Sequence, residues 1–351
     1  MTTNTSSAQP VNEEQDAEAA LMELYSGHPL TRESSEQLFS ALVRGALSEP
    51  VIAAMLVALR LKGETADELI GAARALRAAD EHFERPDYLF ADSCGTGGDG
   101  SGSINISTAA AFVCAAAGLP VAKHGNRSIT SRCGSADVLE RLGAKLDVPA
   151  SVSRRALDET GVCFLFAPLY HPGLRHAGPV RRVLKVRTIM NILGPCLNPA
   201  EPPVQLLGVA DKNLLEPVAT TLAALGVGRA LVVHGAGLDE VALHAETLAV
   251  KVVDGRFEQV VLTPEQAGLT RAPIETLKGG DPEENAERFK MLLLGRAAGA
   301  ETQMVALNAG ALLMTAELAS DLRQGVEMAT EAIASGAAHQ RLEMFIAATH
   351  A

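Results

Sequence analysis

The chain has 351 residues, of which 47% are hydrophobic, and its formal net charge at pH 7 is -12. So acidic a chain is a poor non-specific binder of nucleic acid, because that binding depends on Lys and Arg residues that neutralise phosphates. No apolar run is long enough to cross a bilayer, and the five cysteines stand far apart without a CxxC pair. These features argue against a membrane protein, a disulfide framework and a zinc site, and they predict a cytoplasmic protein.

The N-terminal part of the chain is predicted to be helical. Residues 1–17 are polar and acidic, without the basic and apolar segments of a signal peptide, and are predicted to be a disordered leader. In residues 18–86 apolar side chains recur at helical spacing, with Thr31 and Thr65 as candidate N-caps and Gly63 at the end of a helix. Only short turns separate these helices, so a helical domain packed as a bundle is expected.

Short strands alternate with helices after Pro86. Five apolar runs that end at or near Gly, Asp or Pro are predicted to be buried strands: YLFADSCG, LPVAKHG, VCFLFAPL, QLLGVA and RALVVHG. Helical stretches such as TAAAFVCAAAG and LEPVATTLAALG lie between them, which predicts an α/β fold with a mainly parallel central sheet. Residues 87–170 and 201–351 are assigned to this large domain. The helical insertion 171–200 is expected to join the N-terminal helices.

A glycine-rich loop, DSCGTGGDGSGSINIST at residues 92–108, follows the first predicted strand. Three of its glycines satisfy the pattern G-x-G-x-x-G, but a dinucleotide site also needs an acidic residue near the end of the next strand. That strand ends in Lys123 and His124, and no Walker A sequence occurs. The helix after the loop is expected to begin late, with Ser107 or Thr108 as its N-cap. Since bare amides in such a loop bind anions, a phosphate group is the predicted ligand.

A basic segment, AKHGNRSITSRCGSAD, follows the second predicted strand. It concentrates cationic and hydroxyl side chains in an otherwise acidic protein: Lys123, His124, Arg127 and Arg132 stand among Ser128, Thr130, Ser131 and Ser135. Consecutive strands of a parallel sheet place the loops at their carboxyl ends side by side. The glycine-rich loop and the basic segment are therefore expected to face one crevice, whose charge suits two phosphates or a diphosphate.

Two adjacent carboxylates, Asp239 and Glu240, follow the last predicted strand. Adjacent acidic residues are common on solvated surfaces, and both are expected in a solvent-facing loop. Beside a diphosphate site they gain a chemical purpose, because Mg²⁺ binds through a few carboxylates together with waters and substrate phosphate oxygens. Ser107 is a candidate third ligand from the opposite side of the crevice.

No nucleophilic triad is predicted, since no serine or cysteine has a base at a suggestive spacing. His124 is a candidate substrate contact because it adjoins Lys123 in the basic segment. His171, which precedes Pro172, is equally consistent with a packing residue at the start of a helix.

Five motifs, in this order along the chain, resemble the anthranilate phosphoribosyltransferase family: GTGGDGSGSINIST, AKHGNRSITSRCGSADVLERLG, FLFAPLYHPGLRHAGPVRR, RTIMNILGPCLNP and VVHGAGLDE. The resemblance runs from about Leu21 through the last predicted helix. It implies the nucleoside phosphorylase-like architecture, a small helical domain beside a large α/β domain, and a homodimer formed through the helical domain. It also implies the second step of tryptophan synthesis from chorismate. In that step the amine of anthranilate displaces diphosphate from C1 of phosphoribosyl diphosphate (PRPP), which gives N-(5-phosphoribosyl)anthranilate.

The resemblance also implies which residues form the site. The family's PRPP contacts correspond to Gly95, Gly98, Asp99, Ser103, Asn105, Ile106, Ser107, Thr108, Lys123, His124, Gly125, Asn126, Arg127, Ser128, Ile129, Thr130, Ser131 and Ser135. Its metal ligands correspond to Ser107, Asp239 and Glu240, which implies Mg²⁺, with two ions per subunit. Its anthranilate contacts correspond to Gly95, Asn126 and Arg181. Positioning of the transition state is expected from Lys123, His124 and Asn126. No general base is expected, because an aromatic amine is uncharged at neutral pH and its lone pair is available.

The sequence departs from the family's usual pattern at a few positions. Arg132 and Cys133 replace a commoner lysine and small residue. Gly173 and Leu174 stand where Ala-Met is common, and Met190 stands where Phe is common. The last three flank the expected anthranilate channel, so they bear on substrate affinity more than on the type of reaction.

Two other functions are compatible with parts of the pattern. A pyrimidine nucleoside phosphorylase on the same fold would need one phosphate and no metal, and the Asp239-Glu240 pair and the KHGNR stretch count against it. A non-catalytic relative that binds nucleic acid in the crevice is disfavoured by the acidic net charge. Small-molecule substrates are therefore the expected partners, without nucleic acid or a membrane.

Overall fold

The computed structural model describes residues 13–128, 132–297 and 299–351. Three of the expected PRPP contacts, Ile129, Thr130 and Ser131, lie outside the described residues. Within the described ranges, no helix is both long and apolar enough to cross a membrane.

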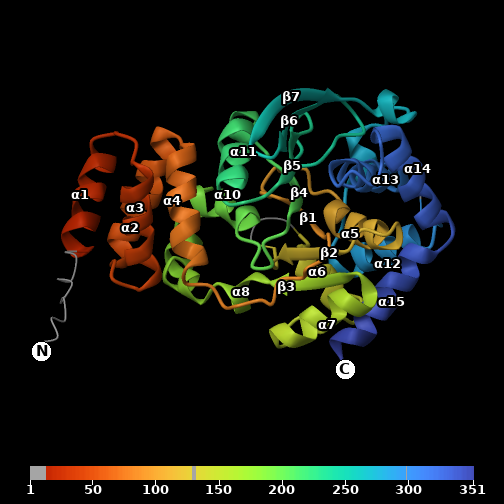
Figure 1. The fold of residues 1–351 in the computed structure, drawn as a ribbon, viewed down its shortest axis with the longest axis horizontal. Helices are drawn as coiled ribbons and strands as arrows, with labels where there is room; N and C mark the ends of the chain where they lie inside the picture. Colours follow the sequence, from red (N-terminus) through yellow and green to blue (C-terminus); the bar gives the residue numbers. More distant parts are fainter. Residues whose placement is uncertain (1–12, 129–131, 298) are drawn as a thin grey trace, which may run out of the picture.

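Four N-terminal helices form a bundle at one end of the molecule (Figure 1). They are α1 (Glu13–Tyr25), α2 (Arg32–Val43), α3 (Glu49–Lys62) and α4 (Ala66–Arg77). Thr31 accepts a hydrogen bond from the Ser34 amide at the start of α2, and Thr65 forms a capping box with Glu68 at the start of α4. Both predicted N-caps are confirmed, and so is the end of α3 at Gly63.

A seven-stranded sheet in the order β3-β2-β1-β4-β5-β6-β7 forms the centre of the large α/β part. Its strands are β1 (Ala91–Gly95), β2 (Val121–Gly125), β3 (Val162–Phe166), β4 (Val204–Gly208), β5 (Arg229–His234), β6 (Thr247–Val253) and β7 (Arg256–Leu262). Strands β1 to β5 are parallel and correspond to the five predicted strands, which confirms the mainly parallel α/β fold. The antiparallel strands β6 and β7 are additional to that prediction.

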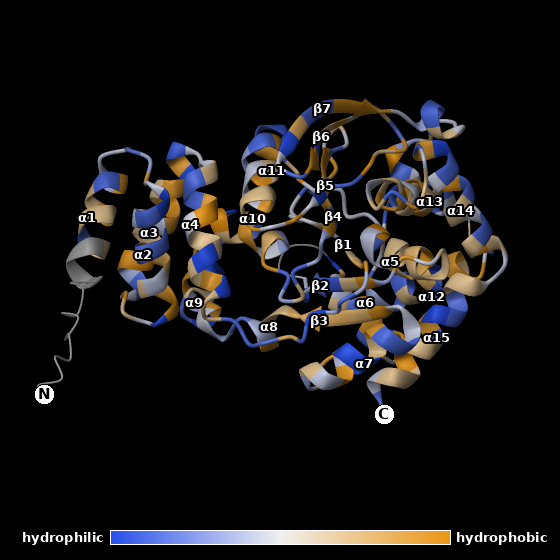
Figure 2. Ribbon diagram, in the orientation of Figure 1, coloured by the Kyte–Doolittle hydropathy of each residue, from blue (hydrophilic) through white to orange (hydrophobic). Residues whose placement is uncertain are grey.

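Helices cover both faces of the sheet, and apolar residues concentrate between them (Figure 2). The covering helices are α5 (Ile106–Ala116), α6 (Ser135–Arg141), α7 (Ala150–Thr160), α11 (Leu215–Ala224), α12 (Pro282–Leu293), α13 (Gly299–Thr315), α14 (Leu322–Ala334) and α15 (Ala337–Thr349). Neighbouring residues of β4 serve different cores, because side chains alternate along a strand. Leu206 belongs to the core of α5 and α13, whereas Leu207 belongs to the core that continues through α11 into the N-terminal helices.

The segment between β3 and β4 returns to the N-terminal helices. It contains α8 (Ala167–Tyr170), the 3-10 helix η1 (Pro172–His176), α9 (Gly178–Leu184) and α10 (Ile189–Cys196). Helix η1 contacts α2, α9 contacts α3, and α10 contacts both α3 and α4. Because α10 also contacts β2, it connects the bundle to the sheet at the strand that carries the basic segment.

Candidate active site

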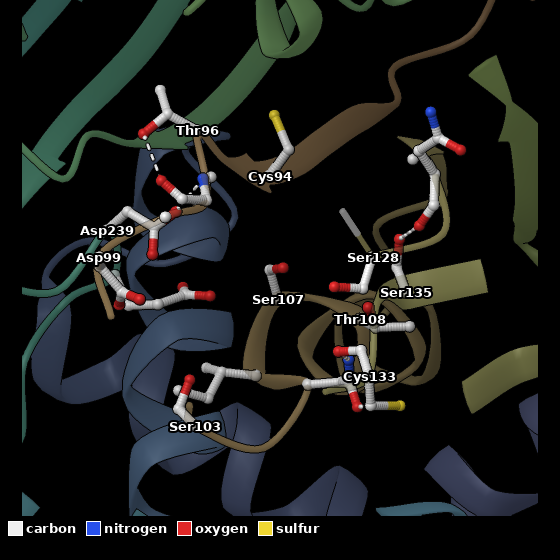
Figure 3. A pocket seen from close by; sticks show the side chains of 18 of the residues that line it. Cys94, Thr96, Asp99, Ser103, Ser107, Thr108, Ser128, Cys133, Ser135 and Asp239 are labelled. Atoms are coloured by element: carbon white, nitrogen blue, oxygen red, sulfur yellow. Dashed lines mark hydrogen bonds between the residues drawn. The ribbon is translucent and has the colours of Figure 1, made fainter. Parts of the chain in front are cut away.

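A cavity of about 310 Å³ lies at the carboxyl ends of the parallel strands. The glycine-rich loop after β1, the basic segment after β2 and the Asp239-Glu240 pair after β5 all line it (Figure 3). Because β1 and β2 are adjacent and parallel, the loops at their ends lie side by side, as predicted. One cavity therefore combines an anion-binding type of loop, a cationic segment and a carboxylate pair.

Most of the expected site residues line this cavity. They are Gly95, Gly98, Asp99, Ser103, Asn105, Ile106, Ser107, Thr108, Lys123, His124, Gly125, Asn126, Arg127, Ser128, Ser135, Asp239 and Glu240. Arg181 is not among the lining residues. Thr96, Cys133 and Asn191 line the cavity in addition to the expected set.

The backbone of the glycine-rich loop requires glycine. Four glycines between Gly97 and Gly102 have φ values from 60° to 74°, a left-handed region that other residues rarely adopt. Asp99 closes the turn, because its Oδ1 accepts hydrogen bonds from the amide and the hydroxyl of Ser101, each 3.0 Å long. A turn of this kind can direct successive amides toward an anion, which is the chemistry predicted from the sequence.

Backbone hydrogen bonds to residues 277–278 hold the second half of the glycine-rich loop in place. Ser103 forms a β-bridge with Lys278, and the Ile104 amide donates to the Leu277 carbonyl oxygen at 2.9 Å. Nothing in the local sequence relates the two segments, so this support cannot be predicted from it.

Helix α5 begins earlier than predicted. Its N-cap is Asn105 and its first residue is Ile106, whereas the sequence predicts Ser107 or Thr108 as the N-cap. The reason is that the bonds to the 277–278 segment end just before Asn105, so the helix can begin there. Ser107 consequently lies in the first turn of α5 and faces the cavity (Figure 3).

Lys123 is a buried cation in the wall of the cavity. Its Nζ donates to the Ser93 carbonyl oxygen at 2.6 Å and to the Ser107 hydroxyl at 3.2 Å. These two bonds fix the ammonium group between β1 and α5. They also fix the Ser107 hydroxyl beside the ammonium group.

The basic segment is folded by acidic residues of the following helix. Asp137 Oδ2 accepts hydrogen bonds from the amides of Ser128 and Gly134, at 2.9 and 2.7 Å. The exposed Arg127 guanidinium pairs with Glu140 at 2.6 Å. The charge of Arg127 is therefore matched by a carboxylate of the following helix.

The expectation of a solvent-facing loop is wrong for Asp239. This residue is buried and Glu240 is half-buried, because the chain after β5 folds back over the strand ends. Asp239 packs so closely against Gly208 in β4 that a Cβ atom there would overlap the Asp239 backbone. The Asp239 Oδ2 accepts a hydrogen bond from the Gly97 amide at 2.6 Å, which ties the carboxylate loop to the glycine-rich loop (Figure 3).

Both carboxyl groups have raised pKa values. Burial, followed by the charge of Asp99, raises the pKa of Asp239 to about 7, and burial together with Asp239 raises the pKa of Glu240 to about 8. Among the described residues, no group of three His, Cys, Asp or Glu side chains could hold a metal ion alone. Lys123 opposes the rise at Glu240, yet the pKa values of both carboxyl groups stay raised, so the pair fits a cation that also binds water and substrate oxygens, as Mg²⁺ does.

His124 and His171 contact each other beside the cavity. The His124 Nε2 lies 2.9 Å from the His171 Nε2, and the His171 Nδ1 lies 2.5 Å from the Asp80 Oδ1. Both imidazole rings are buried. Packing alone therefore does not account for His171, whose two ring nitrogens are both engaged.

Arg181 lies on α9 and is not among the residues that line the cavity. Its side chain is half-buried, and burial lowers the pKa of the guanidinium. Within the described ranges it has no hydrogen-bond or ion-pair partner, whereas the neighbouring Arg182 is exposed. A cation held partly out of water without a partner is suited to an anionic ligand.

Arg187 is a further residue that contacts the glycine-rich loop, beyond those expected from the sequence. Its guanidinium donates to the Gly98 carbonyl oxygen at 3.2 Å and to the Thr96 hydroxyl at 3.3 Å. It thereby connects the segment between α9 and α10 to the glycine-rich loop. The available signal is its place at the start of the motif RTIMNILGPCLNP.

The departures from the family pattern lie mainly outside the cavity. Of these positions, only Cys133 lines it. Gly173 packs against Val43 of α2, where an added Cβ would lie 2.8 Å from the Val43 Cβ. Met190 is buried in the core shared with the N-terminal helices. Gly173 and Met190 therefore act on how the inserted segment packs against the bundle.

Two family models cover most of the chain. Residues 18–79 match the model described as the helical bundle domain of a glycosyl transferase family, and residues 87–339 match the model of its a/b domain. The anthranilate phosphoribosyltransferase of Sorangium cellulosum is 57% identical over 329 residues, which cover 94% of each chain. That of Vibrio parahaemolyticus is 50% identical over 330 residues, which cover 94% of this chain and 99% of the other.

Solved structures give the same result. The anthranilate phosphoribosyltransferase of Thermus thermophilus is 44% identical, with a TM-score of 0.90 over 95% of this chain and 99% of the other. The enzyme of Saccharomyces cerevisiae in complex with PRPP and Mg is 26% identical, with a TM-score of 0.87 over 96% and 98%. The chain therefore belongs to the anthranilate phosphoribosyltransferase family.

Proposed function

We propose that this enzyme transfers the phosphoribosyl group of PRPP to the amine of anthranilate and releases diphosphate, the second step of tryptophan synthesis. The observation that carries the proposal is that a glycine-rich loop, a basic segment and a carboxylate pair meet in one cavity. Relatives named for this reaction support it over nearly the whole chain. The test is product formation. PRPP, MgCl₂ and anthranilate should give N-(5-phosphoribosyl)anthranilate and diphosphate in equal amounts, and a protein that only binds PRPP should give neither.

The two loops are proposed to bind PRPP. Amides of the glycine-rich loop suit its phosphate oxygens, because no side chains cover that backbone. The hydroxyl groups and cations of the basic segment, including residues 129–131, are assigned the same role by the family resemblance. Lys123, His124 and Asn126 are proposed to position the ribose carbon and the attacking amine.

Charge develops on both sides of the bond that breaks. Departure of diphosphate from C1 leaves negative charge on the diphosphate and positive charge on the ribose. When bound, Mg²⁺ would neutralise the leaving group, and we assign two ions to Ser107, Asp239 and Glu240. Lys123 holds the Ser107 hydroxyl in place and adds fixed positive charge. The amine of anthranilate attacks with its own lone pair, so the protein needs to supply position and electrostatics but no base.

Arg181 is proposed to bind the anthranilate carboxylate, because a guanidinium can bond both oxygens of a planar carboxylate. Arg181→Ala should raise the KM for anthranilate by roughly ten- to a hundredfold, the loss of one charge-assisted contact of about 1.5–3 kcal/mol. The KM for PRPP should hardly move, since the two loops hold that substrate. Arg182→Ala on the same helix is the control. Equal effects on both substrates, or a larger effect at Arg182, would show that Arg181 is misassigned.

A homodimer through the helical part is proposed from its exposed apolar side chains. Leu61 on α3 is 82% exposed and Val183 on α9 is 81% exposed, and α3 contacts both α1 and α9. Met22 and Tyr25 on α1 are also exposed. Separate exposed apolar residues are ordinary, but a group on neighbouring helices is typical of an interface.

Leu61→Glu is expected to weaken this dimer by at least about thirtyfold, because it places a charge in an apolar interface. Light scattering over a dilution series should show monomer at concentrations where the unmodified protein is dimeric. Phe257→Glu, on the exposed strand β7, is the control and should leave the dimer unchanged. A monomeric unmodified protein, or equal effects of the two substitutions, would contradict the proposed interface.

The packing of the helices also supports a division of the chain into two domains. We propose one domain from residues 18–86 with 171–200, and another from residues 87–170 and 201–351. In support, the buried residues of α9 and α10 share a core with α1–α4. A cytoplasmic location is also proposed, because the buried Cys94, Cys114, Cys163 and Cys196 form no disulfide, as is usual in a reducing compartment.

A further inference from the structure

A series of buried hydrogen bonds runs from the end of α4 to the wall of the cavity. Asp80, which follows α4, bonds to His171, which precedes η1, and His171 bonds to His124 in β2. The two imidazole rings meet edge to face, with centroids 4.9 Å apart and planes at 74°. The His124 Nδ1 completes the series, 3.2 Å from the Gly194 carbonyl oxygen. Both nitrogens of His124 are therefore bonded inside the protein, although its residue lines the cavity.

The protons in this series can be placed from the chemistry of its ends. A carbonyl oxygen only accepts, so the His124 Nδ1 facing Gly194 must carry a hydrogen. Burial, helped by the nearby His171 and Lys123, lowers the pKa of His124 well below its ordinary value, so the ring is neutral. A neutral ring with a hydrogen on Nδ1 has a lone pair on Nε2. The His171 Nε2 must then be the donor in the bond between the two histidines.

Asp80 is at the other end of this series of hydrogen bonds and orients the His171 ring. With a hydrogen on Nε2, the His171 ring either accepts at Nδ1 from a protonated Asp80 or, as a cation, donates from Nδ1 to an ionised Asp80. Burial raises the pKa of Asp80 while the charges of His171 and Arg77 oppose that rise, and its Oδ2 is buried without a partner. Both cases leave the same hydrogens on His171 Nε2 and His124 Nδ1.

We propose that Asp80 and His171 are positioning residues that hold His124 as the neutral Nδ1–H tautomer, so that it forms a fixed, uncharged aromatic wall of the active site. This inference rests on the proposed function. It assigns His124 neither the role of a base nor that of a cationic phosphate ligand. The partners of its ring, Gly194 and His171, belong to the inserted segment that also carries Arg181. The aromatic acceptor, more than PRPP, should therefore depend on this ring.

Nuclear magnetic resonance of protein labelled with ¹⁵N-histidine tests the tautomer directly, with His124 assigned from a His124→Asn sample. The unmodified protein should show a protonated Nδ1 and an unprotonated Nε2 at His124. Asp80→Asn should keep this pattern, because the Asn amide can donate to the His171 Nδ1. Asp80→Ala and His171→Phe should mix in other forms of the ring, because the bond to the Gly194 carbonyl oxygen is then left without the second bond that holds the hydrogen on Nδ1. A protonated Nε2 or a charged ring in the unmodified protein would overturn the proposal.

Kinetics of the same variants supply the functional readout. Asp80→Ala should raise the KM for anthranilate about tenfold, the effect of losing one buried hydrogen bond, while the KM for PRPP changes by less than about twofold. Asp80→Asn should restore the KM for anthranilate, and Glu81→Gln, an exposed carboxylate on the same connection, should have no effect. Failure of Asp80→Asn to restore it, or equal changes for both substrates, would overturn the positioning role.

The two proposals fail in different ways. An unmodified protein without transferase activity would remove the proposed function, whatever tautomer His124 adopts. An active protein whose His124 tautomer does not depend on Asp80 would remove the present inference and leave the function standing.

Discussion

Replacing Asp239 by Asn and Glu240 by Gln together is expected to lower kcat by at least about a hundredfold, the scale of losing a main stabiliser of transition-state charge. Amides keep the shape of the two side chains but cannot supply the negative charge that holds Mg²⁺ beside the diphosphate. The isosteric pair is preferable to alanine, because Asp239 is buried and its Oδ2 binds the Gly97 amide. Steady-state turnover with both substrates and Mg²⁺ at saturation is the measurement. Normal turnover in the double variant would remove the metal assignment.

Stability of the same variant separates a lost ligand from a lost fold. Both carboxyl groups have folded-state pKa values, about 7 and about 8, above those of the unfolded chain. Protons bound only in the folded state stabilise it at low pH, and that stability is lost as the pH rises from about 4 toward 8. In EDTA, the double variant should therefore melt no lower than the unmodified protein at pH 5 and progressively higher than it up to pH 8. If the double variant melts well below the unmodified protein at every pH, its loss of turnover reflects a folding defect.

Gly98→Val is expected to weaken PRPP binding by at least about a hundredfold, because the loop that should receive its phosphates is reshaped. Gly98 has a φ of 70°, which a β-branched residue adopts only with strain. Its added Cβ would also lie 3.1 Å from the Arg187 Nε, so the bond from Arg187 to the loop is disturbed. Titration calorimetry of PRPP with Mg²⁺ is the measurement.

A second glycine provides the matched control for this substitution. Gly255, in the turn between β6 and β7, has a φ of 75° and open space around it. Gly255→Val should introduce a similar backbone strain and yet bind PRPP normally, because the turn is remote from the cavity. If Gly98→Val also binds PRPP normally, the glycine-rich loop is not the phosphate site.

Much of the fold follows from local patterns. The five parallel strands are short, almost entirely buried and part of apolar runs that end at or near Gly, Asp or Pro, so their type and order can be predicted. Strands β6 and β7 are harder, because β7 is almost entirely exposed and lacks an apolar run. The Asp254-Gly255 turn between them, with a positive φ at both residues, was the available signal.

The candidate site also combines features that local sequence predicts with contacts that it does not. The glycine-rich loop and the basic segment can each be recognised from the sequence. The adjacent parallel strands β1 and β2 then place them side by side. The burial of Asp239 cannot be read locally, because it depends on the absence of a side chain at Gly208 on another strand. The bond between Asp80 and His171 joins residues 91 positions apart, and the bridge from Ser103 to Lys278 joins two distant segments. Such contacts exist only once the chain has folded.

Anthranilate fluorescence tests the central claim most directly, since the acceptor loses its fluorescence as it is consumed. With enzyme, PRPP, Mg²⁺ and anthranilate together, the fluorescence should decay in proportion to enzyme concentration. It should stay constant when PRPP is omitted or EDTA is in excess. A parallel assay of thymidine phosphorolysis should show no reaction. Constant fluorescence in the complete mixture, or phosphorolysis of thymidine, would contradict the assignment of this cavity to phosphoribosyl transfer from PRPP to anthranilate.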